Sequence, residues 1–341
     1  GPAAAAGGGG AFGAWAAGHG KVYGGEEEAA ARAAVWEDNR QFVGRENAAA
    51  RAAGRSLRLD LNEFSDLTWE EFRTPRLGTS LEPGRRGTLP QRAQTRGPFV
   101  PGNVTVPLNW VERGAVTPVK DQGQCGSCWS FSTTGAIEGV NALYYKRHGG
   151  NDTDALEAVS EQELVDCDTA DSGCNGGLMD YAFSFVVEND GIDTEKDYPY
   201  DARVHSCDVP RRDRRVVTID GHVDVQPGNE TALMRAVRRG PVSIAIEADQ
   251  RAFQFYSGGV FDAPCGDSLD HGVLIVGYGK DEDSDQDYWL VKNSWGASWG
   301  DQGYIKLAMG IAPSGQCGLT SMASYPVKKS PNPPRPPPTP P

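Results

Sequence analysis

Gln122-Gly-Gln-Cys125-Gly-Ser-Cys128-Trp129-Ser-Phe131 is the stretch of sequence on which the fold and the chemistry depend. Two cysteines separated by two residues can form half of a zinc site or a redox pair. A zinc site would need a second such pair or a histidine-rich partner, and the remaining cysteines stand singly. A redox pair would need a thioredoxin-like βαβ setting, whereas a long helix is expected from Cys128 to about Arg147. We therefore expect no metal site and no cofactor.

Cys128 is instead placed to act as a nucleophile. It stands where the helix should begin, so unpaired backbone N–H groups and the positive end of the helix dipole would stabilise a thiolate and lower the pKa of the thiol. The chain has 7 cysteines, all between Cys125 and Cys317. An odd number in one compact region indicates paired bridges plus one working thiol.

A thiolate nucleophile needs a base, and 5 histidines are available. His19, His148 and His205 sit in polar or glycine-rich loops, while His222 and His271 lie in strand-like runs. The default for a strand histidine is an ordinary hydrogen-bonded side chain. The residues alone therefore leave His222 and His271 as rivals.

Composition limits the classes of function. With 341 residues the chain can hold two ordinary domains or one large two-lobed domain, and its apolar residues are dense from Val106 to Tyr325. A net charge of -13 argues against nucleic acid as a partner. No apolar run approaches the roughly 20 residues that cross a bilayer. The start, Gly-Pro followed by Ala and Gly runs, suggests a trimmed precursor, a fragment or an expression remnant.

Local patterns predict an α+β fold. Helices are expected over residues 128–147, 160–165 and 178–189, and strands over 242–246, 271–278, 288–292 and 303–307. A helical lobe beside a β lobe would leave a groove between them. The basic cluster at 211–215 and the acidic stretch at 281–287 are expected to be solvated loops.

The segment Gly123–Phe131 resembles the nucleophile segment of the papain family of cysteine proteases, whose signature is Cys-Gly-[Ser/Ala]-Cys-[Trp/Tyr]. Leu269-Asp270-His271-Gly resembles the histidine segment of that family and follows Cys128 by about 140 residues, within the family's range of about 130–150. Lys-Asn293-Ser-Trp295-Gly resembles the asparagine segment. The resemblance covers roughly residues 12–327, and it implies a papain-like fold with a helical lobe and a β-barrel-like lobe.

The resemblance also implies roles. Cys128 would attack the peptide carbonyl, His271 would serve as its base, and Asn293 would orient the imidazole. Trp295 would shield the bond between Asn293 and His271 from water, and the side chain of Gln122 would complete an oxyanion hole. An inactive homologue that serves as a binding protein is the rival hypothesis, and a redox or metal protein is a distant third.

The same resemblance pairs the cysteines and outlines the substrate site. It implies the disulfides Cys125–Cys174, Cys167–Cys207 and Cys265–Cys317, and it places Gly176 and Gly177 at the edge where the substrate backbone lies. One pocket is expected to hold the substrate residue two positions before the cut, and its expected lining is apolar: Leu178, Met179, Ala245, Leu269 and Met322. Asp270 is expected to be a further substrate-binding residue. We expect Leu, Phe or Val in this pocket and not Arg.

A helical pattern from Glu28 to Asn47, with Trp36 and Val43 on its apolar face, could be an ordinary surface helix. It resembles the Glu-Arg-Phe-Asn-Ile-Asn motif of inhibitory pro-regions. A strand-like stretch over residues 57–61 leads into Asn62, Phe64 and Asp66, which match a second pro-region motif, with Asp60 where that motif has Gly. The resemblance implies that the prodomain plugs the groove until acid weakens its contacts and a cut near residues 101–107 releases the body.

The expected organisation has five parts: residues 1–11 as a low-complexity start, 12–73 as an inhibitory prodomain, 74–103 as an exposed activation linker, 104–327 as the peptidase domain and 328–341 as a proline-rich tail. The tail is expected to be an extended spacer without a core, similar to the one in plant granulin-type members of the cathepsin L-like subgroup. No large insertion suggests an exopeptidase, so an endopeptidase is expected.

The cysteine count and three Asn-x-Thr sequons, at Asn103, Asn151 and Asn229, indicate the secretory pathway, with a vacuole or lysosome or the extracellular space as destination. The expected partners are peptide and protein substrates, the chain's own prodomain and cystatin-like inhibitors. We expect a monomer that contacts neither nucleic acid nor membrane.

Overall fold

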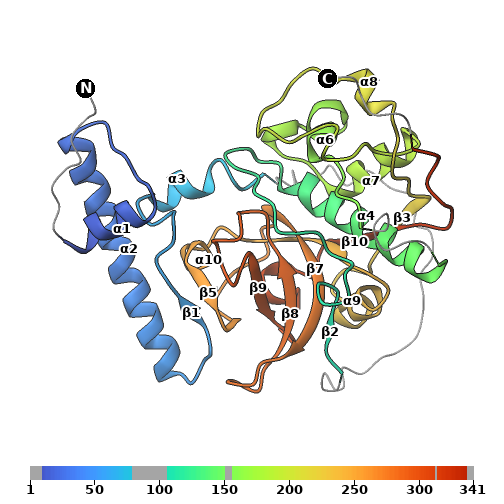
Figure 1. Ribbon diagram of the computed structural model, residues 1–341. Coiled ribbons are helices and arrows are strands. Elements are labelled where there is room, and N and C mark those ends of the chain that lie inside the picture. The colour runs from blue at the N-terminus through green and yellow to red at the C-terminus, as the bar shows by residue number, and fades with distance from the viewer. Residues whose placement is uncertain (1–9, 79–105, 150–155, 312, 336–341) are drawn as a thin grey trace.

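The structure is a computed structural model that describes residues 10–78, 106–149, 156–311 and 313–335. Its body has a helical lobe and a lobe built on an 8-stranded sheet, and two N-terminal helices extend to one side (Figure 1). The expected α+β architecture with two lobes and a helical prodomain is confirmed. Among the described residues, no helix is both long and apolar enough to span a bilayer.

Helices predominate in the first part of the chain and strands in the second, with a few short elements of the other kind in each. The helices are α1 Ala11–Gly18, α2 Glu26–Ala52, α3 Trp69–Arg73, α4 Cys128–Arg147, α6 Glu161–Cys167, α7 Met179–Glu188, α8 Val209–Arg212, α9 Glu230–Val237 and α10 Arg251–Gln254. The strands are β1 Arg58–Leu59, β2 Leu108–Asn109, β3 Gly221–Asp224, β4 Val242–Ile246, β5 Tyr256–Gly258, β6 Val260–Phe261, β7 His271–Lys280, β8 Asp287–Lys292, β9 Tyr304–Ala308 and β10 Ala323–Val327. Short 3-10 turns lie at Gly173–Asn175 and Gln316–Gly318.

Helix α4 lies between the two lobes and packs against β7 (Figure 1). A β-carbon at Gly135 would come within 2.8 Å of the Leu274 side chain, so glycine lets helix and strand approach closely. The Ser132 hydroxyl donates to the carbonyl of Val273 on β7 at 2.7 Å. Because α4 is buried on most of its surface, its first residue is fixed relative to β7.

The main sheet has the strand order β3-β10-β4-β7-β8-β9-β6, with β2 paired to β7. Strand β7 is central, and its partners β4 and β8 are both antiparallel to it. The register places Ile246 opposite His271 and Ala245 opposite Gly272. The sheet therefore brings the end of β4 beside the first residues of β7, at the edge that faces α4.

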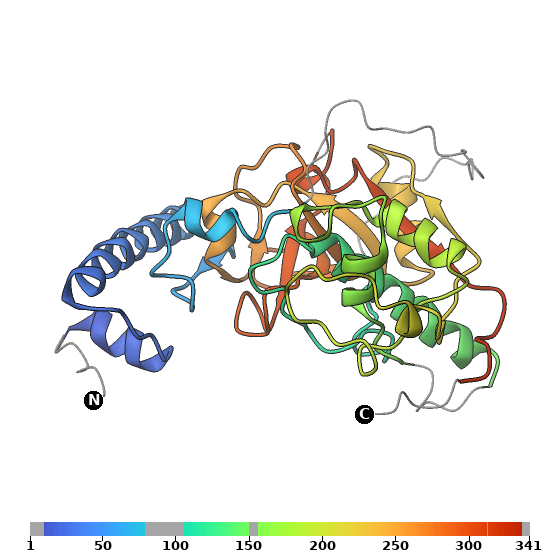
Figure 2. The ribbon, with the colours of Figure 1, turned by 90° about the horizontal axis from the view of Figure 1, so that it is seen from above.

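The N-terminal region folds around α2, which projects from the body (Figure 2). Trp36 packs against Phe12 and Trp15 of α1, with ring centroids 5.9 and 6.2 Å apart. Asn39 is buried and donates to the carbonyls of Ser65 and Leu67 at 2.9 and 3.0 Å. The helix expected over Glu28–Asn47 is present and longer, and its motif residues hold the following loop instead of facing solvent.

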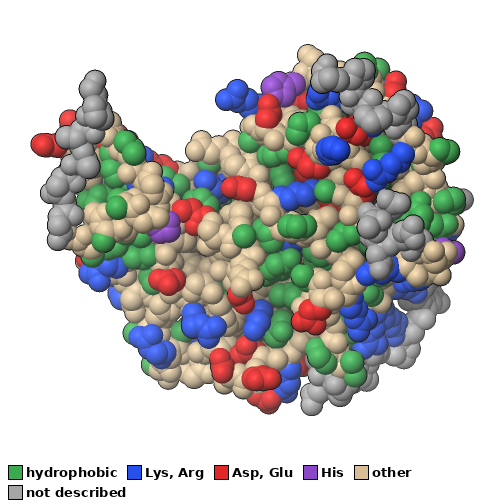
Figure 3. Space-filling model, in the orientation of Figure 1, with side chains coloured by type: hydrophobic (Ala, Val, Ile, Leu, Met, Phe, Trp, Pro, Cys, Tyr) green, Lys and Arg blue, Asp and Glu red, His purple; other side chains and the backbone are tan. Residues whose placement is uncertain are grey.

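The prodomain docks on the body through backbone and side-chain bonds. Strand β1 pairs with β5 in a separate two-stranded sheet, and the Asp60 N–H donates to the Phe255 carbonyl at 2.9 Å. Asp60 thus fits where the related motif has Gly. In the space-filling view, the upper edge of the molecule is hollowed between the N-terminal helices and the helical lobe (Figure 3).

Residues 76–78, near the start of the expected linker 74–103, are largely buried, which corrects the expectation of exposure for this part alone. Arg76 has only 8% of its surface exposed, and its guanidinium lies over the rings of Phe64 and Phe72, at 4.5 and 5.1 Å from their centroids. Leu77 packs against the core and Gly78 is buried. Residues 79–105 lie outside the described residues. Arginine could be buried here because two aromatic faces receive it.

The tail is also not a free spacer over its described part. Buried Lys328 donates to the Thr218 carbonyl at 2.7 Å and to Asn332 at 2.6 Å. Asn332 receives the Thr218 N–H at 3.0 Å and donates to the Tyr145 hydroxyl and to Asn141 of α4, at 2.9 and 3.0 Å. The first residues of the tail are therefore strapped to the helical lobe.

Two charged stretches expected to be solvated loops are partly buried. In the basic cluster, the Arg214 side chain is only 10% exposed and forms ion pairs with Asp193 and Asp197 at 3.2 and 2.7 Å. In the acidic stretch, Asp281 is buried and pairs with Lys306 at 3.2 Å. Their ion-pair partners lie on other segments, so local charge did not indicate burial.

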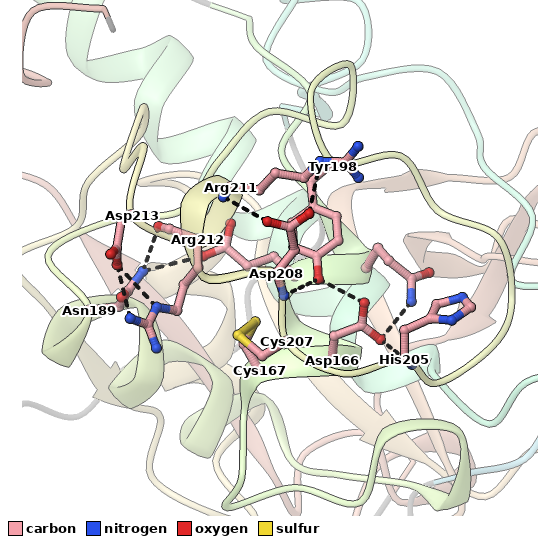
Figure 4. Close-up of a disulfide and its surroundings, with 12 residues drawn as sticks. Asp166, Cys167, Asn189, Tyr198, His205, Cys207, Asp208, Arg211, Arg212 and Asp213 are labelled. Carbon is pink, nitrogen blue, oxygen red and sulfur yellow. Dashed lines mark hydrogen bonds and ion pairs between the residues drawn. A yellow bond between two sulfur atoms is a disulfide. The ribbon is translucent and has the colours of Figure 1, made fainter. Parts of the chain in front are cut away.

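Three disulfides join the pairs that the resemblance implied: Cys125–Cys174, Cys167–Cys207 and Cys265–Cys317. The second one ties the end of α6 to the loop before α8 (Figure 4). Beside it, Asp166 accepts from the Tyr198 hydroxyl at 2.8 Å and from the His205 N–H at 2.7 Å. Among the described residues, Cys128 is the one cysteine that forms no disulfide.

Candidate active site

Cys128 and His271 meet where α4 and β7 begin. Both side chains are fully buried, and the N–H of Gly272 donates to Cys128 Sγ at 3.3 Å. A β-carbon at Gly272 would come within 3.2 Å of the backbone of Trp129, so glycine permits this approach. The two residues that the sequence places far apart are thus brought together by the contact between α4 and β7.

The imidazole of His271 is held in one orientation. Its Nε2 lies 2.8 Å from Asn293 Oδ1, and its ring stacks on Trp295 with centroids 4.7 Å apart. Because an amide oxygen only accepts hydrogen bonds, Nε2 carries the proton in the neutral ring and Nδ1 is left as the acceptor. Among the described residues, buried Nδ1 has no hydrogen-bond partner.

Burial in the covered groove favours the neutral form of His271. Burial lowers the pKa of His271 to about 4, against the opposing effects of the bond to Asn293 and of the nearby Asp270 carboxylate. Burial also raises the pKa of Asp270 to about 7, although its carboxylate accepts the Ala248 N–H at 2.7 Å. In this state the ring is neutral and can accept a proton.

Gln122 is fully buried just before α4, and its side-chain amide is already engaged. Its Nε2 donates to the Arg76 carbonyl at 2.9 Å and to the Cys125 carbonyl at 2.8 Å. Its Oε1 accepts from the Ser294 hydroxyl at 2.7 Å, and its backbone N–H donates to the Ser294 carbonyl at 2.8 Å. A buried amide fixed at both ends can present one N–H to an oxygen in the groove, and the prodomain supplies that oxygen here.

Tyr200, which the sequence analysis did not identify, holds Gln122 in place through a hydrogen bond to its backbone. Its hydroxyl donates to the Gln122 carbonyl at 2.8 Å and lies 2.6 Å from the Ser127 hydroxyl, next to Cys128. Its ring meets Phe131 edge-on at 4.8 Å. No local pattern marks this tyrosine, because its role depends on a loop that returns to α4.

The chain after α3 fills the groove. Gly78 accepts from the Gly177 N–H at 3.1 Å, and a β-carbon on Gly78 would come within 2.0 Å of the Gly126 carbonyl. A β-carbon on Gly176 would in turn come within 1.9 Å of Gly78. Gly176 and Gly177 therefore form an edge against which another backbone lies, and the pro-segment 76–78 occupies it.

Three of the residues expected to line a pocket, Met179, Ala245 and Met322, lie close to Gly272 or to its strand partner. Met179 and Ala245 both flank Gly272, since Ala245 is its strand partner and the Met179 sulfur would be 3.2 Å from a β-carbon there. The Ala245 N–H donates to the Met322 carbonyl at 3.0 Å. Leu269 is buried two residues before His271, while Leu178 is half-buried at the start of α7.

Of the glycosylation candidates, only Asn229 lies among the described residues. Its side-chain oxygen accepts the Ala232 N–H at 2.9 Å and caps α9. Asn103 and Asn151 lie outside the described residues.

A cysteine outside the disulfides at a helix start, beside a histidine held by an amide in a groove that an N-terminal segment fills, defines the class of thiol protease proenzymes. The comparisons agree, and the chain belongs to the papain family of cysteine proteases. Residues 105–327 match the model described as "Papain family cysteine protease", and residues 12–72 match the "Cathepsin propeptide inhibitor domain". The chain is therefore a proenzyme with its own inhibitory prodomain.

Relatives and solved structures are similar over most of the chain. It is 50% identical to "Probable cysteine protease RD21B" of Arabidopsis thaliana over 90% of this chain and 63% of that protein. With "Cysteine proteinase RD21A" of the same plant it shares 47% identity over 96% of this chain and 68% of that protein. The chain thus spans about two thirds of the length of these relatives.

Solved proforms have the same architecture. The proform of the ragweed pollen cysteine protease Amb a 11 matches with a TM-score of 0.80 and 35% identity, over 93% of this chain and 94% of that one. Procathepsin L 3 from the larval midgut of Tenebrio molitor matches with a TM-score of 0.77 and 37% identity, over 93% and 97%.

Proposed function

We propose that this chain is the zymogen of an endopeptidase in which Cys128 is the nucleophile, His271 the general base and acid, and Asn293 the residue that orients the imidazole. The observation that supports this most is the arrangement of His271. Nε2 is held by Asn293, buried Nδ1 is left as an acceptor, and the adjacent Gly272 N–H donates to Cys128 Sγ.

The proposed reaction has two steps. Nδ1 of His271 takes the thiol proton, Sγ of Cys128 bonds to the peptide carbonyl carbon, and the protonated ring then gives its proton to the leaving amine. A water molecule, deprotonated by the same nitrogen, attacks the thioester, and the carboxylic acid product leaves as Sγ is released. Removal of the pro-segment would let water reach His271, which would raise the pKa of the ring from its value in the covered state.

Gln122 would stabilise the oxyanion. Its amide N–H now binds the Arg76 carbonyl at 2.9 Å, and a substrate carbonyl would take that place in the mature enzyme. Removing one such donor costs about 10²–10³ in kcat in other proteases. We expect Gln122→Ala to lower kcat by a factor in that range, with folding unchanged as measured by circular dichroism.

The pocket around Met179, Ala245, Leu269 and Met322 would receive the residue two positions before the cut. All are apolar, so a guanidinium would lose its hydration without gaining a charged partner. We expect Leu and Phe reporters to be cut with a higher kcat/KM than an otherwise identical Arg reporter. Equal values for the Leu and Arg reporters would contradict this assignment.

Acid would weaken the hold of the prodomain. Arg73 pairs with Asp249 at 3.5 Å, and Arg55 pairs with Asp262 at 3.1 Å, both across the interface. Burial and the neighbouring Glu247 raise the pKa of Asp249, so this carboxylate is protonated at a higher pH than usual and its pair with Arg73 is lost early as the pH falls. A cut near residues 101–107 would then separate prodomain and body.

We further propose peptide and protein substrates, a monomeric enzyme, inhibition by cystatin-like proteins and a route through the secretory pathway to a vacuole, lysosome or the extracellular space. The three disulfides favour an oxidising route. A glycan at Asn229 would require its half-buried side chain to release the Nδ2 hydrogen bond to Gln226 Oε1 at 3.1 Å, while its oxygen caps α9.

Hydrolysis of a Leu-Arg fluorogenic peptide tests the proposal after acid activation, with and without a thiol-alkylating epoxide. We expect turnover that the epoxide abolishes and that is absent from Cys128→Ala and His271→Ala. No turnover by correctly processed protein would favour a binding protein instead, and turnover that persists in Cys128→Ala would assign the nucleophile elsewhere.

A further inference from the structure

We propose that Asp180, His222 and Asp224 form a binding site for one divalent transition-metal cation, remote from the catalytic thiol. Each residue offers one ligand atom, and these three atoms all lie within 4.8 Å of one another. The set contains one imidazole nitrogen and two carboxylate oxygens, a combination suited to Zn²⁺ or Mn²⁺. The sequence shows no metal motif here, because the ligands come from separate elements.

The fold places the three ligands on facing surfaces. Asp180 lies in the first turn of α7, and His222 and Asp224 are two residues apart on β3, so their side chains point to the same face of the strand. Helix α7 packs against β3, as Figure 1 shows. The His222 ring stacks on Phe183 of the same helix, with centroids 5.8 Å apart, which holds the imidazole over α7.

Asp180 is half-buried, and one oxygen of its carboxylate, Oδ1, is buried without a hydrogen-bond partner among the described residues. The Ser324 hydroxyl lies beside the carboxylate. No lysine or arginine in the described part of the chain forms an ion pair with Asp180 or Asp224. Two carboxylates therefore meet here beside a single imidazole.

A metal ion would supply a positive charge opposite the carboxylates of Asp180 and Asp224, and it would bind the buried Oδ1 of Asp180. Zn–N and Zn–O bonds of about 2.1 Å put ligand atoms about 3.4 Å apart in a tetrahedron, so shifts of about 1 Å in three side chains close the set. Asp224 is exposed, which gives an ion access from solvent, and water would complete the coordination. The bound ion would link the start of α7 to β3.

The position of the site connects it to the groove. Asp180 follows Met179, and Ser324 lies two residues after Met322, both of which line the proposed substrate pocket. Ser324 is opposite Asp224 in the register of β10 and β3. An ion here would therefore fix both walls of that pocket, namely the start of α7 and the strand β10, on the side away from the substrate. Its first expected effect is nevertheless on stability, because ligands that bind only the folded state raise Tm.

Equilibrium dialysis with Zn²⁺ tests the site in the full-length proenzyme. Cys128→Ala serves as the parent, since this change removes a competing thiol and prevents self-cleavage. We expect one Zn²⁺ per chain at about pH 7 and a Tm that rises by about 2–5 °C in saturating Zn²⁺. His222→Asn and Asp224→Asn are each expected to weaken binding at least about tenfold and to abolish the rise in Tm.

His205→Asn is the matched control. His205 also lies beside a carboxylate, with Nε2 2.7 Å from Asp201, but it is exposed and has no second acid in a comparable group of three. It should bind Zn²⁺ like the parent. No binding by the parent, or equal losses in His222→Asn and His205→Asn, would overturn the proposal. A Tm that depends on pH through His222 but not on Zn²⁺ would assign the cluster to an ordinary ion pair.

Discussion

Arg251 should control how often the groove of the zymogen opens. This residue of α10 donates to the buried Asn39 Oδ1 through Nε and Nη2 at 3.2 and 2.6 Å, and to Asp38 at 2.5 Å. Its guanidinium lies 4.5 Å from the centroid of the Phe42 ring. Arg251→Ala would therefore remove the cation that contacts α2 and leave Oδ1 of the buried Asn39 without this donor.

The expected loss follows from these contacts. A hydrogen bond to a charged group contributes about 1.5–3 kcal/mol, and the contact with the aromatic face about 0.5–1 kcal/mol. The ion pair with Asp38 adds little, because that carboxylate is 66% exposed. The sum of about 2–4 kcal/mol corresponds to about 30-fold to 1,000-fold more of the open form, at about 1.4 kcal/mol per factor of ten.

Alkylation of Cys128 in the intact zymogen measures that opening. At neutral pH the rate of labelling, followed by intact mass, is proportional to the open population when reclosing is fast. Arg251→Ala should raise the rate by about 30-fold to 1,000-fold. Asp38→Ala should raise it less than about fivefold. Arg40→Ala is the matched control, because the one ion pair of Arg40 within the described part of the chain is with Glu37 of the same helix.

Two outcomes would refute this reasoning. An unchanged rate in Arg251→Ala would mean that the pro-segment 76–78 leaves the groove while α2 stays docked. Equal effects of Asp38→Ala and Arg251→Ala would mean that simple charge attraction, and not the bond to buried Asn39, holds the helix.

Three further predictions concern pH, catalysis and stability. Burial and a neighbouring carboxylate raise the pKa of Asp171 to about 9. Between about pH 4 and 9 the native state therefore holds a proton that the unfolded state has lost, so the free energy of unfolding falls as the pH rises. Urea titrations of Asp171→Asn should show a smaller decline. Tyr200→Phe removes the bond to the Gln122 carbonyl and should lower kcat by about threefold to thirtyfold with little change in KM, since it shifts an oxyanion donor without deleting it; a change in KM alone would contradict this. Removing the Cys265–Cys317 bridge with two alanines opens a loop with a sequence separation of 52 and should lower the free energy of unfolding by about 4 kcal/mol in denaturant titrations.

The elements around the thiol could be predicted closely from the sequence. Helix α4 begins and ends at the expected residues, and β4 covers the expected Val242–Ile246. These segments have strong local signals, namely a helix start at a cysteine and a run of β-branched residues. The approach of His271 to Cys128 came from the family resemblance, since no local pattern states which histidine a thiol will meet.

The errors share one physical cause. Arg76, Lys328 and Arg214 belong to segments whose Gly, Pro, Lys or Arg content indicates exposure, yet all three side chains are largely buried. Each is accommodated by partners on other segments: aromatic faces for Arg76, backbone and amide oxygens for Lys328, and two carboxylates for Arg214. Composition indicates what a segment can do alone, whereas burial depends on what the fold brings to it.

The strap from Lys328 to Asn332 determines how the molecule bears mechanical load. A pull on the chain beyond Asn332 stretches the bonds from Asn332 to Tyr145 and Asn141 before any tension reaches β10. Strand β10 would otherwise peel away from β3 one bond at a time, starting at Val327. With the strap in place, tension passes into α4, which is buried on most of its surface, and the wall of the groove that contains Met322 is isolated from it. A label or further chain attached to the tail should therefore swing without disturbing the pocket.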